Sequence, residues 1–205
     1  DAILSRGLGD VYKRQIMGPS GSGKSTLLNL LSLIDNPTAG SIEISNNKIK
    51  SNNKVKNDLI RAKKIGIIYQ DKNLLSDFTA LENVYLPNLL VSKEKQKSIE
   101  LAKKLLKNVG MSSRINHFPN ELSGGENQRI AIARALINNP DIILADEPTG
   151  SLDSDNAKLI FKILFNFKNK NRIIIFATHN RYFANMADCK IMMNDGNIKI
   201  INAST

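Results

Sequence analysis

The sequence predicts an α/β fold with a mainly parallel core sheet, antiparallel β-hairpins and a helical subdomain. The runs "IILAD" (142–146) and "IIIFAT" (173–178) are continuously apolar, which is typical of strands covered on both faces. "IGIIY" (65–69) predicts another short buried strand. Because 205 residues suffice for one substantial core, we expect these strands to belong to one unit.

Turn signals predict two hairpins beside the parallel strands. Asn46-Asn47 separates two strand-like runs within residues 41–50, and Asp195-Gly196 does the same within residues 190–201. Short Asn, Asp or Gly turns between such runs favour antiparallel pairing of the flanking segments.

Helical periodicity occurs in three parts of the chain. Leucines predict a helix from Ser25 to about Leu33, and a second helix is expected from Ser154 to Phe167. A longer helical stretch, from about Thr79 to Asn139, is expected to form most of a subdomain over residues 77–139. Breaks are expected at Pro87, Gly110, Pro119 and the Gly124-Gly125 pair.

The composition excludes several classes of protein. Hydrophobic residues make up 41% of the chain and charged residues 23%, which argues against a disordered or fibrous protein. The lone cysteine, Cys189, lies among apolar residues and is expected to be a buried structural thiol. No apolar run reaches the roughly 18 residues that span a bilayer, so any membrane role would come from another chain.

The formal charge of +10 has two readings. A polyanionic partner, such as nucleic acid or an anionic membrane surface, is one of them. The other is a solvated surface, because lysines occupy the polar face of an amphipathic helix over residues 92–110. We favour the solvated surface and expect no nucleic-acid partner.

The stretch "GPSGSGKST" (18–26) contains the phosphate-binding pattern G-x-x-x-x-G-K-[ST]. Glycines let the backbone curl so that N–H groups point at phosphate oxygens, and the helix that follows adds its positive N-terminal end. Lys24 supplies a charge for the outer phosphates, and Ser25 offers a hydroxyl to Mg²⁺. The expected nucleotide-binding residues here are Gly18, Pro19, Ser20, Gly21, Ser22, Gly23, Lys24, Ser25 and Thr26.

Two acidic residues lie at the ligand-facing end of the predicted strand 142–146, where Asp146 ends the strand and Glu147 follows it. Asp146 is expected to reach the Mg²⁺ of a bound nucleotide, because parallel sheets bind ligands at the carboxyl ends of their strands. Glu147 can polarise a water in line with the γ-phosphate. An acidic turn is common by itself, but Mg²⁺-nucleotide chemistry requires such a carboxylate beside a phosphate loop.

A second anion site is predicted within "LSGGENQRIAIARAL" (122–136). Ser123 stands at a helix start, and Gly124 and Gly125 open the backbone there. The helix is expected to turn Ile130, Ala133 and Leu136 inward. One chain seldom needs two phosphate clamps for one nucleotide, so the second clamp is expected to serve a neighbouring copy.

Together these motifs resemble the nucleotide-binding subunits of ATP-binding-cassette (ABC) transporters, over Ile16 to about Ile201. "GPSGSGKST" resembles the Walker A loop of that family, "IILADE" its Walker B strand and "LSGGE" its signature. The resemblance implies a P-loop NTPase fold, ATP and Mg²⁺ as ligands, and ATP hydrolysis coupled to transport.

The resemblance also assigns roles to single residues. Gln70 matches the glutamine that contacts Mg²⁺ and senses the membrane subunits, and Ser25 and Asp146 are the other expected metal ligands. Glu147 and His179 match the catalytic base and the histidine that contacts the γ-phosphate. The remaining expected ATP contacts, made across a head-to-tail homodimer, are Ser123, Gly124, Gly125, Glu126 and Asp153.

Three stretches, 27–42, 73–87 and 145–153, resemble the branch of the family whose membrane partners extract substrates. The nearest likeness is to the ATPase subunits of lipoprotein-releasing complexes, and macrolide-exporter and cell-division members share the pattern. The resemblance implies a peripheral protein on the cytoplasmic face of the inner membrane, bound to two integral-membrane subunits. The rival class, a soluble ABC ATPase acting on nucleic acid or ribosomes, is disfavoured because the chain has neither a long coiled coil nor tandem cassettes.

Residues 1–15 show neither the family pattern nor clear strand alternation. We expect them to be a non-native leader, and residues 16–205 to be one nucleotide-binding domain that lacks its first strands and their adenine-stacking aromatic. In the chain as written, Val11 and Tyr12 are the candidates for extending the strand before Gly18. Because the loss of stacking weakens ATP binding, an inactive truncated fragment is the alternative for this chain.

Overall fold

The computed structural model describes residues 13–44, 47–49, 53–168 and 172–202. Its main sheet has six strands in the order β4-β5-β6-β1-β7-β8; the first five are parallel to one another, and β8 is antiparallel to β7. The strands of this sheet are β1 (Lys13–Met17), β4 (Ile65–Ile68), β5 (Ile142–Asp146), β6 (Ile173–Ala177), β7 (Cys189–Asn194) and β8 (Asn197–Asn202). The predicted α/β fold with a mainly parallel sheet is confirmed.

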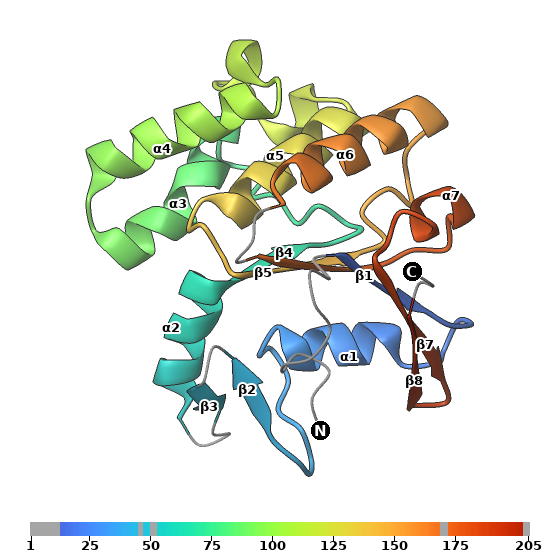
Figure 1. Ribbon diagram of the computed structural model, residues 1–205. Coiled ribbons are helices and arrows are strands. Elements are labelled where there is room, and N and C mark those ends of the chain that lie inside the picture. The colour runs from blue at the N-terminus through green and yellow to red at the C-terminus, as the bar shows by residue number, and fades with distance from the viewer. Residues whose placement is uncertain (1–12, 45–46, 50–52, 169–171, 203–205) are drawn as a thin grey trace.

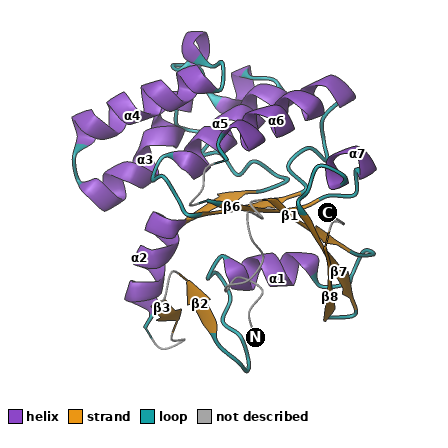
Figure 2. Ribbon diagram, in the orientation of Figure 1, coloured by secondary structure: helices purple, strands orange, loops and turns teal. Residues whose placement is uncertain are grey.

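Helices cover both faces of this sheet (Figure 1). Helix α1 lies on one face, and α3 to α6 lie on the other (Figure 2). The α-helices are α1 (Lys24–Leu31), α2 (Lys54–Lys64), α3 (Ala80–Ser92), α4 (Lys95–Asn108), α5 (Gly124–Leu136), α6 (Ser154–Asn166) and α7 (Arg181–Ala184). Two 3₁₀ turns, η1 (Ser112–Arg114) and η2 (Pro119–Glu121), lie between α4 and α5.

The sheet is buried on both faces, as its apolar strands predict. Along β5, Ile143 and Ala145 join the core under α3 to α6, whereas Ile142 and Leu144 join the core over α1. Successive side chains of a strand point to opposite faces, so a strand between two helical layers must be apolar throughout. Cys189 belongs to the second core and is 1% exposed, as expected of a structural thiol.

Both predicted hairpins are present. Strands β7 and β8 pair antiparallel around Asp195-Gly196, and β2 (Ile42–Ile44) pairs with β3 (Asn47–Ile49) in a small separate sheet. Asn47, expected in the turn, is the first residue of β3 and pairs with Ile44.

Two of the expected helix breaks are wrong. Pro87 lies inside α3, which continues through it because Val84 and Tyr85 anchor the helix in the core and a capping box between Thr79 and Glu82 fixes its start. The Gly124-Gly125 pair forms the first turn of α5 rather than a gap before it. Gly110 does end α4, with φ at 74°.

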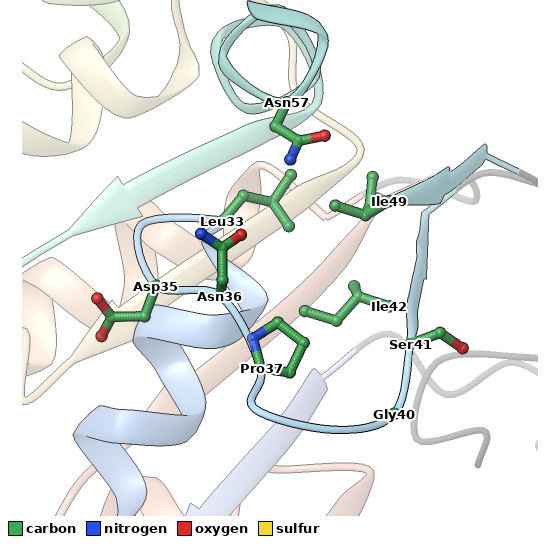
Figure 3. A pocket seen from close by; sticks show the side chains of 9 residues that line it. All are labelled: Leu33, Asp35, Asn36, Pro37, Gly40, Ser41, Ile42, Ile49 and Asn57. Carbon is green, nitrogen blue, oxygen red and sulfur yellow. The ribbon is translucent and has the colours of Figure 1, made fainter. Parts of the chain in front are cut away.

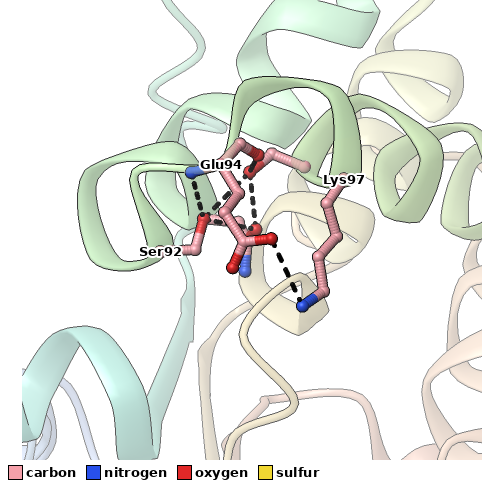
Figure 4. Close-up of polar contacts among 5 residues, drawn as sticks. Ser92, Glu94 and Lys97 are labelled. Atoms are coloured by element: carbon pink, nitrogen blue, oxygen red, sulfur yellow. Dashed lines mark hydrogen bonds and ion pairs between the residues drawn. The ribbon is translucent and has the colours of Figure 1, made fainter.

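The turn between α3 and α4, which the sequence did not indicate, is closed by polar side chains (Figure 4). Ser98 donates to Asn88 Oδ1 at 2.7 Å, and Glu94 pairs with Lys97 at 3.5 Å. Asn88 in turn donates to Asn138 Oδ1 at 2.8 Å. The Asn138 amide also donates to the carbonyls of residues 62 and 87, so this side chain joins α2 and α3 to the turn that follows α5.

Strand β1 corrects the expectation that the residues before Ile16 lack strand character. Residues 13–15 pair with β6 on one side, and residues 14 and 15 also pair with β7 on the other. Backbone hydrogen bonds to two neighbours hold a central strand whatever its side-chain pattern, and here Gln15 is fully buried. The suggested contribution of Val11 and Tyr12 lies outside the described residues.

We expect Phe161→Ala in α6 to lower the free energy of unfolding by about 3–5 kcal/mol, measured by chemical denaturation. Phe161 is 1% exposed, stacks on Phe183 with ring centroids 3.9 Å apart, and meets Phe176 edge-on. The substitution removes these contacts and leaves a cavity. Leu90→Ala is the control, because Leu90 is 81% exposed and its loss should change stability by at most about 0.5 kcal/mol.

Candidate nucleotide-binding site

The glycine loop joins the carboxyl end of β1 to the start of α1. Gly23 caps α1 with φ at 97°, a backbone conformation that side chains disfavour. A Cβ on Gly18 would lie 2.2 Å from the Met193 carbonyl oxygen, so only glycine lets the loop approach β7 this closely. The loop is therefore shaped by its glycines, as the pattern predicts.

Hydrogen bonds fix the curl of this loop. Ser22 N–H donates to Pro19 O at 3.2 Å, and Gly196 N–H donates to Ser22 O at 3.2 Å. The Lys24 ammonium donates to the carbonyls of Gly18 and Pro19 at 2.9 and 2.8 Å, which holds its charge against the loop. Ser20 and Gly21 are exposed at the tip of the loop, and Thr26 is exposed in the first turn of α1.

Two oxygen ligands of the kind that Mg²⁺ prefers lie side by side. Ser25 Oγ donates to Asp146 Oδ2 at 3.0 Å, although 121 positions separate the two residues. Among the described residues there is no group of three or more His, Cys, Asp or Glu side chains that could enclose a metal. A hydroxyl and one carboxylate fit Mg²⁺ all the same, because this ion binds through one or two carboxylates together with phosphate oxygens and water.

Glu147 and His179 meet next to this pair. Glu147 Oε1 lies 3.4 Å from His179 Nε2, and the carboxylate is 17% exposed whereas the imidazole is 65% exposed. Glu147 has a left-handed backbone with φ at 41°, and its N–H donates to Ala177 O at 3.0 Å. Burial raises the pKa of Glu147 above its usual range, and the charge of His179 opposes this only in part.

Gln70 follows β4 and approaches the turn after Glu147. A Cβ on Gly150 would lie 3.2 Å from Gln70 Nε2 and 3.5 Å from Glu147 Cβ. The structure thus brings Gln70 next to the loop that carries the acidic residues.

The predicted second anion site begins with a capping box. Ser123 Oγ accepts from Glu126 N–H at 3.2 Å, and Glu126 Oε2 accepts from Ser123 N–H at 2.8 Å. The bond from the Ser123 backbone N–H to the carboxylate is the main cause that lowers the pKa of Glu126, and the Ser123 side chain lowers it further. The first-turn N–H groups of Gly124 and Gly125 have no acceptor within the helix, so they are the donors that a ligand can use.

Asp153 caps α6 beside the start of α5. Its carboxylate accepts from Asn156 N–H at 3.0 Å and from Asn156 Nδ2 at 2.6 Å, and these bonds lower the pKa of Asp153. Asn156 Oδ1 lies 2.8 Å from where a Cβ on Gly125 would be. The Asn156 side chain therefore bonds to Asp153 and lies against Gly125 of the second anion site.

A cavity of about 270 Å³ adjoins the glycine loop and is lined by residues from several elements. Its lining includes Gly18, Pro19, Lys24, Thr178 and His179. A second hollow, between the end of α1 and the β2–β3 hairpin, measures only about 20 Å³ (Figure 3). That volume holds a single water molecule, so nucleotide-sized ligands are excluded from it.

None of the helices that the structure describes is long and apolar enough to cross a bilayer.

Residues 8–150 match the family described as ABC transporter. The chain belongs to the ABC transporter family. It is the ATP-binding and ATP-hydrolysing component of such a transporter, as the motifs and their geometry indicate.

Relatives support the same assignment. An uncharacterized ABC transporter ATP-binding protein of Methanocaldococcus jannaschii is 47% identical over 91% of this chain and 84% of its own. The lipoprotein-releasing system ATP-binding protein LolD of Rickettsia bellii is 47% identical over 84% of this chain and 76% of its own. The LolD of Cytophaga hutchinsonii is 43% identical over 88% of this chain and 83% of its own.

A solved structure shows the same fold. It is the dimeric post-hydrolysis state of an ATP-binding cassette bound to ADP and Pi, with a TM-score of 0.85 and 37% identity over 97% of this chain and 89% of that one.

Several contacts in this site escaped the motif reasoning. Arg134 contacts the segment after Gln70, which is distant from it in sequence. Asn156 lies against Gly125, and a glycine has no side chain that would signal such a contact. The capping box had a local signal in the S-x-x-E spacing of Ser123 and Glu126.

We expect Glu147→Gln to gain stability relative to the parent protein as the pH rises from about 4 to 7. Because the folded pKa of Glu147 is raised, its contribution is fully present below the unfolded pKa of about 4.3 and is lost as the pH rises through the folded pKa. The uncharged glutamine escapes that loss. Thermal unfolding of both proteins at several pH values measures the difference.

Glu126→Gln is the matched control with the opposite sign. The folded pKa of Glu126 is lowered, so the parent's advantage over this variant is present above the unfolded pKa and vanishes as the pH falls through the folded pKa. Parallel pH profiles for the two variants would contradict the burial assigned to Glu147.

Proposed function

We propose that this chain binds Mg²⁺-ATP in the loop 18–26 and hydrolyses it with Glu147 as general base. The observation that carries the proposal is the meeting of two pairs at the carboxyl ends of β1, β5 and β6. Ser25 Oγ lies 3.0 Å from Asp146 Oδ2, and Glu147 Oε1 lies 3.4 Å from His179 Nε2.

Each group has a defined task in this proposal. Loop N–H groups and Lys24 bind the phosphates, while Ser25, Asp146 and Gln70 hold Mg²⁺. The ion neutralises charge on the phosphate oxygens when it is bound. Glu147 takes a proton from the attacking water, and its raised pKa brings it nearer to neutral pH, where proton transfer is efficient. His179 contacts the γ-phosphate from its exposed position.

The proposed working state is a head-to-tail homodimer. Ser123, Gly124, Gly125 and Glu126 of one copy cover the nucleotide bound by the other, and Asp153 connects the two sites. The dimeric cassette with ADP and Pi supports this arrangement, because it shares the fold at 37% identity. Contacts made only in the closed dimer let ATP shift the population towards it.

The substrate that we propose is lipoprotein, released from the inner membrane by two integral-membrane subunits. Relatives named as lipoprotein-releasing ATPases, 43% to 47% identical to this chain, support this branch. The chain would sit on the cytoplasmic face, with Gln70 to Phe78 against the membrane subunits. Leu75 and Phe78 in that segment are 49% and 38% exposed, as a contact surface requires. A macrolide-exporter or cell-division complex is the alternative branch.

Glu147→Gln is expected to keep ATP binding and to lower the ATP turnover number by about 10²- to 10⁴-fold, because the variant cannot accept the proton of the attacking water. Steady-state phosphate release and equilibrium binding of a fluorescent ATP analogue measure the two properties. Glu100→Gln, on the exposed surface of α4, is the matched control and should turn over normally. Undiminished turnover in Glu147→Gln would contradict the assignment of Glu147 as the general base.

The branch is tested with the chain assembled in proteoliposomes with the membrane subunits of a lipoprotein-releasing complex. Acylated lipoprotein should stimulate ATP hydrolysis and leave the vesicles in an ATP-dependent manner. A non-acylated version of the same protein is the control. Stimulation by a macrolide instead, in vesicles with exporter subunits, would move the chain to the alternative branch.

A further inference from the structure

We propose that Arg134 is a positioning residue, which fastens the segment 69–73 to α5 and thereby holds Gln70 beside the turn that follows Glu147. This inference rests on the proposed function, in which Gln70 is a ligand of Mg²⁺. Arg134 itself touches neither nucleotide nor metal in this scheme.

The contact is a two-pronged clamp on consecutive carbonyls. Arg134 Nη1 donates to Asn73 O at 2.5 Å and Nη2 donates to Lys72 O at 2.7 Å. A guanidinium presents its N–H groups in a rigid planar fork, so two simultaneous bonds fix both the position and the orientation of the acceptors. The side chain is half-buried, so its bond to Lys72 O is partly shielded from competing water, whereas its bond to Asn73 O lies at the surface.

The clamped backbone is one that needs external support. Asn73 has a left-handed conformation with φ at 48°. Such a conformation persists in a non-glycine residue when the surroundings favour it, and asparagine tolerates it better than most residues. The two bonds from Arg134 act on the carbonyl of this residue and on the one before it.

Two further bonds secure the segment on either side of Gln70. Gln128, which is 1% exposed in α5, donates from Nε2 to Tyr69 O at 3.5 Å. Lys72 Nζ donates to Ser151 Oγ at 2.7 Å, in the loop that follows Glu147. The segment is therefore tied to α5 at both ends and to the acidic loop once, with the Gln70 amide lying beside Gly150.

Helix α5 gives this clamp its significance. The helix starts at the capping box of Ser123 and carries Arg134 in its last turn. The same rigid element thus holds the second anion site at one end and the Gln70 segment at the other. A purely structural role would make Arg134 matter for stability alone, whereas a positioning role makes it matter for Mg²⁺ as well.

The test uses Arg134→Met in the Glu147→Gln background, where nucleotide binds without turnover. The readout is the Mg²⁺ concentration that half-saturates binding of a fluorescent ATP analogue. We expect Arg134→Met to raise this concentration about tenfold, because hydrogen bonds from a charged donor are lost. Arg134→Lys should recover part of the effect, since an ammonium can reach one carbonyl but cannot orient two.

Amide hydrogen exchange over residues 70–73 is the second readout, and it does not require nucleotide. Exchange there should be faster in Arg134→Met than in the parent. Ile163→Val, buried in α6, is the stability control. It should lower the melting temperature while leaving both the Mg²⁺ requirement and the exchange of residues 70–73 unchanged.

The outcomes separate this inference from the proposed function. If Arg134→Met lowers the melting temperature but changes neither the Mg²⁺ requirement nor the exchange, the positioning role is overturned. If the Glu147→Gln parent itself shows no Mg²⁺-dependent nucleotide binding, the proposed function fails, and hydrogen exchange alone decides whether Arg134 clamps the segment. Should Arg134→Met not fold, Arg134→Lys carries both measurements.

Discussion

The parallel pairing of β1 between β6 and β7 is the constraint on which the site depends. In this register Ile16 lies opposite Ala177, and Ala177 lies opposite Asp146 on its other side. Three strands therefore end at one level of the sheet, and the residues that follow them emerge together. The phosphate loop, the acidic pair and His179 are neighbours because their strands are in register, although more than 100 positions separate the loop from the other two.

The sequence predicted the parts of the fold in which a local pattern and tertiary burial agree. Continuous apolar runs located β4, β5 and β6, since a strand between two helical layers has no polar face. Helix α2 was missed because its stretch, Lys54–Lys64, is rich in charge and carries few apolar residues. Pro87 was misjudged because burial of its neighbours outweighs the loss of one backbone hydrogen bond.

The chemistry of the site was easier to predict than its supports. Phosphate binding depends on residue types at fixed spacing, so Gly18 to Ser25 could be found without coordinates. The capping box at Ser123 was legible in principle, yet its effect on Glu126 becomes clear only from the bond between the carboxylate and the backbone. Arg134 donates to the carbonyls of Asn73 and Lys72, which lie 61 and 62 positions before it in the sequence. No periodicity in the sequence encodes such a contact.

The side-chain amide of Asn138 limits which substitutions this part of the chain can tolerate. It donates to two backbone carbonyls, those of residues 62 and 87, and accepts from the side chain of Asn88. A substitution at position 138 would leave these two carbonyls without their donor. Because a backbone carbonyl is present whatever the residue type, no second substitution at position 62 or 87 can remove the unpaired acceptor. Loss of Asn88, in contrast, would remove a partner only from side chains, including those of Asn138 and Ser98, and from no backbone carbonyl. Position 138 is therefore the less replaceable member of the pair, although neither residue lies in the catalytic site.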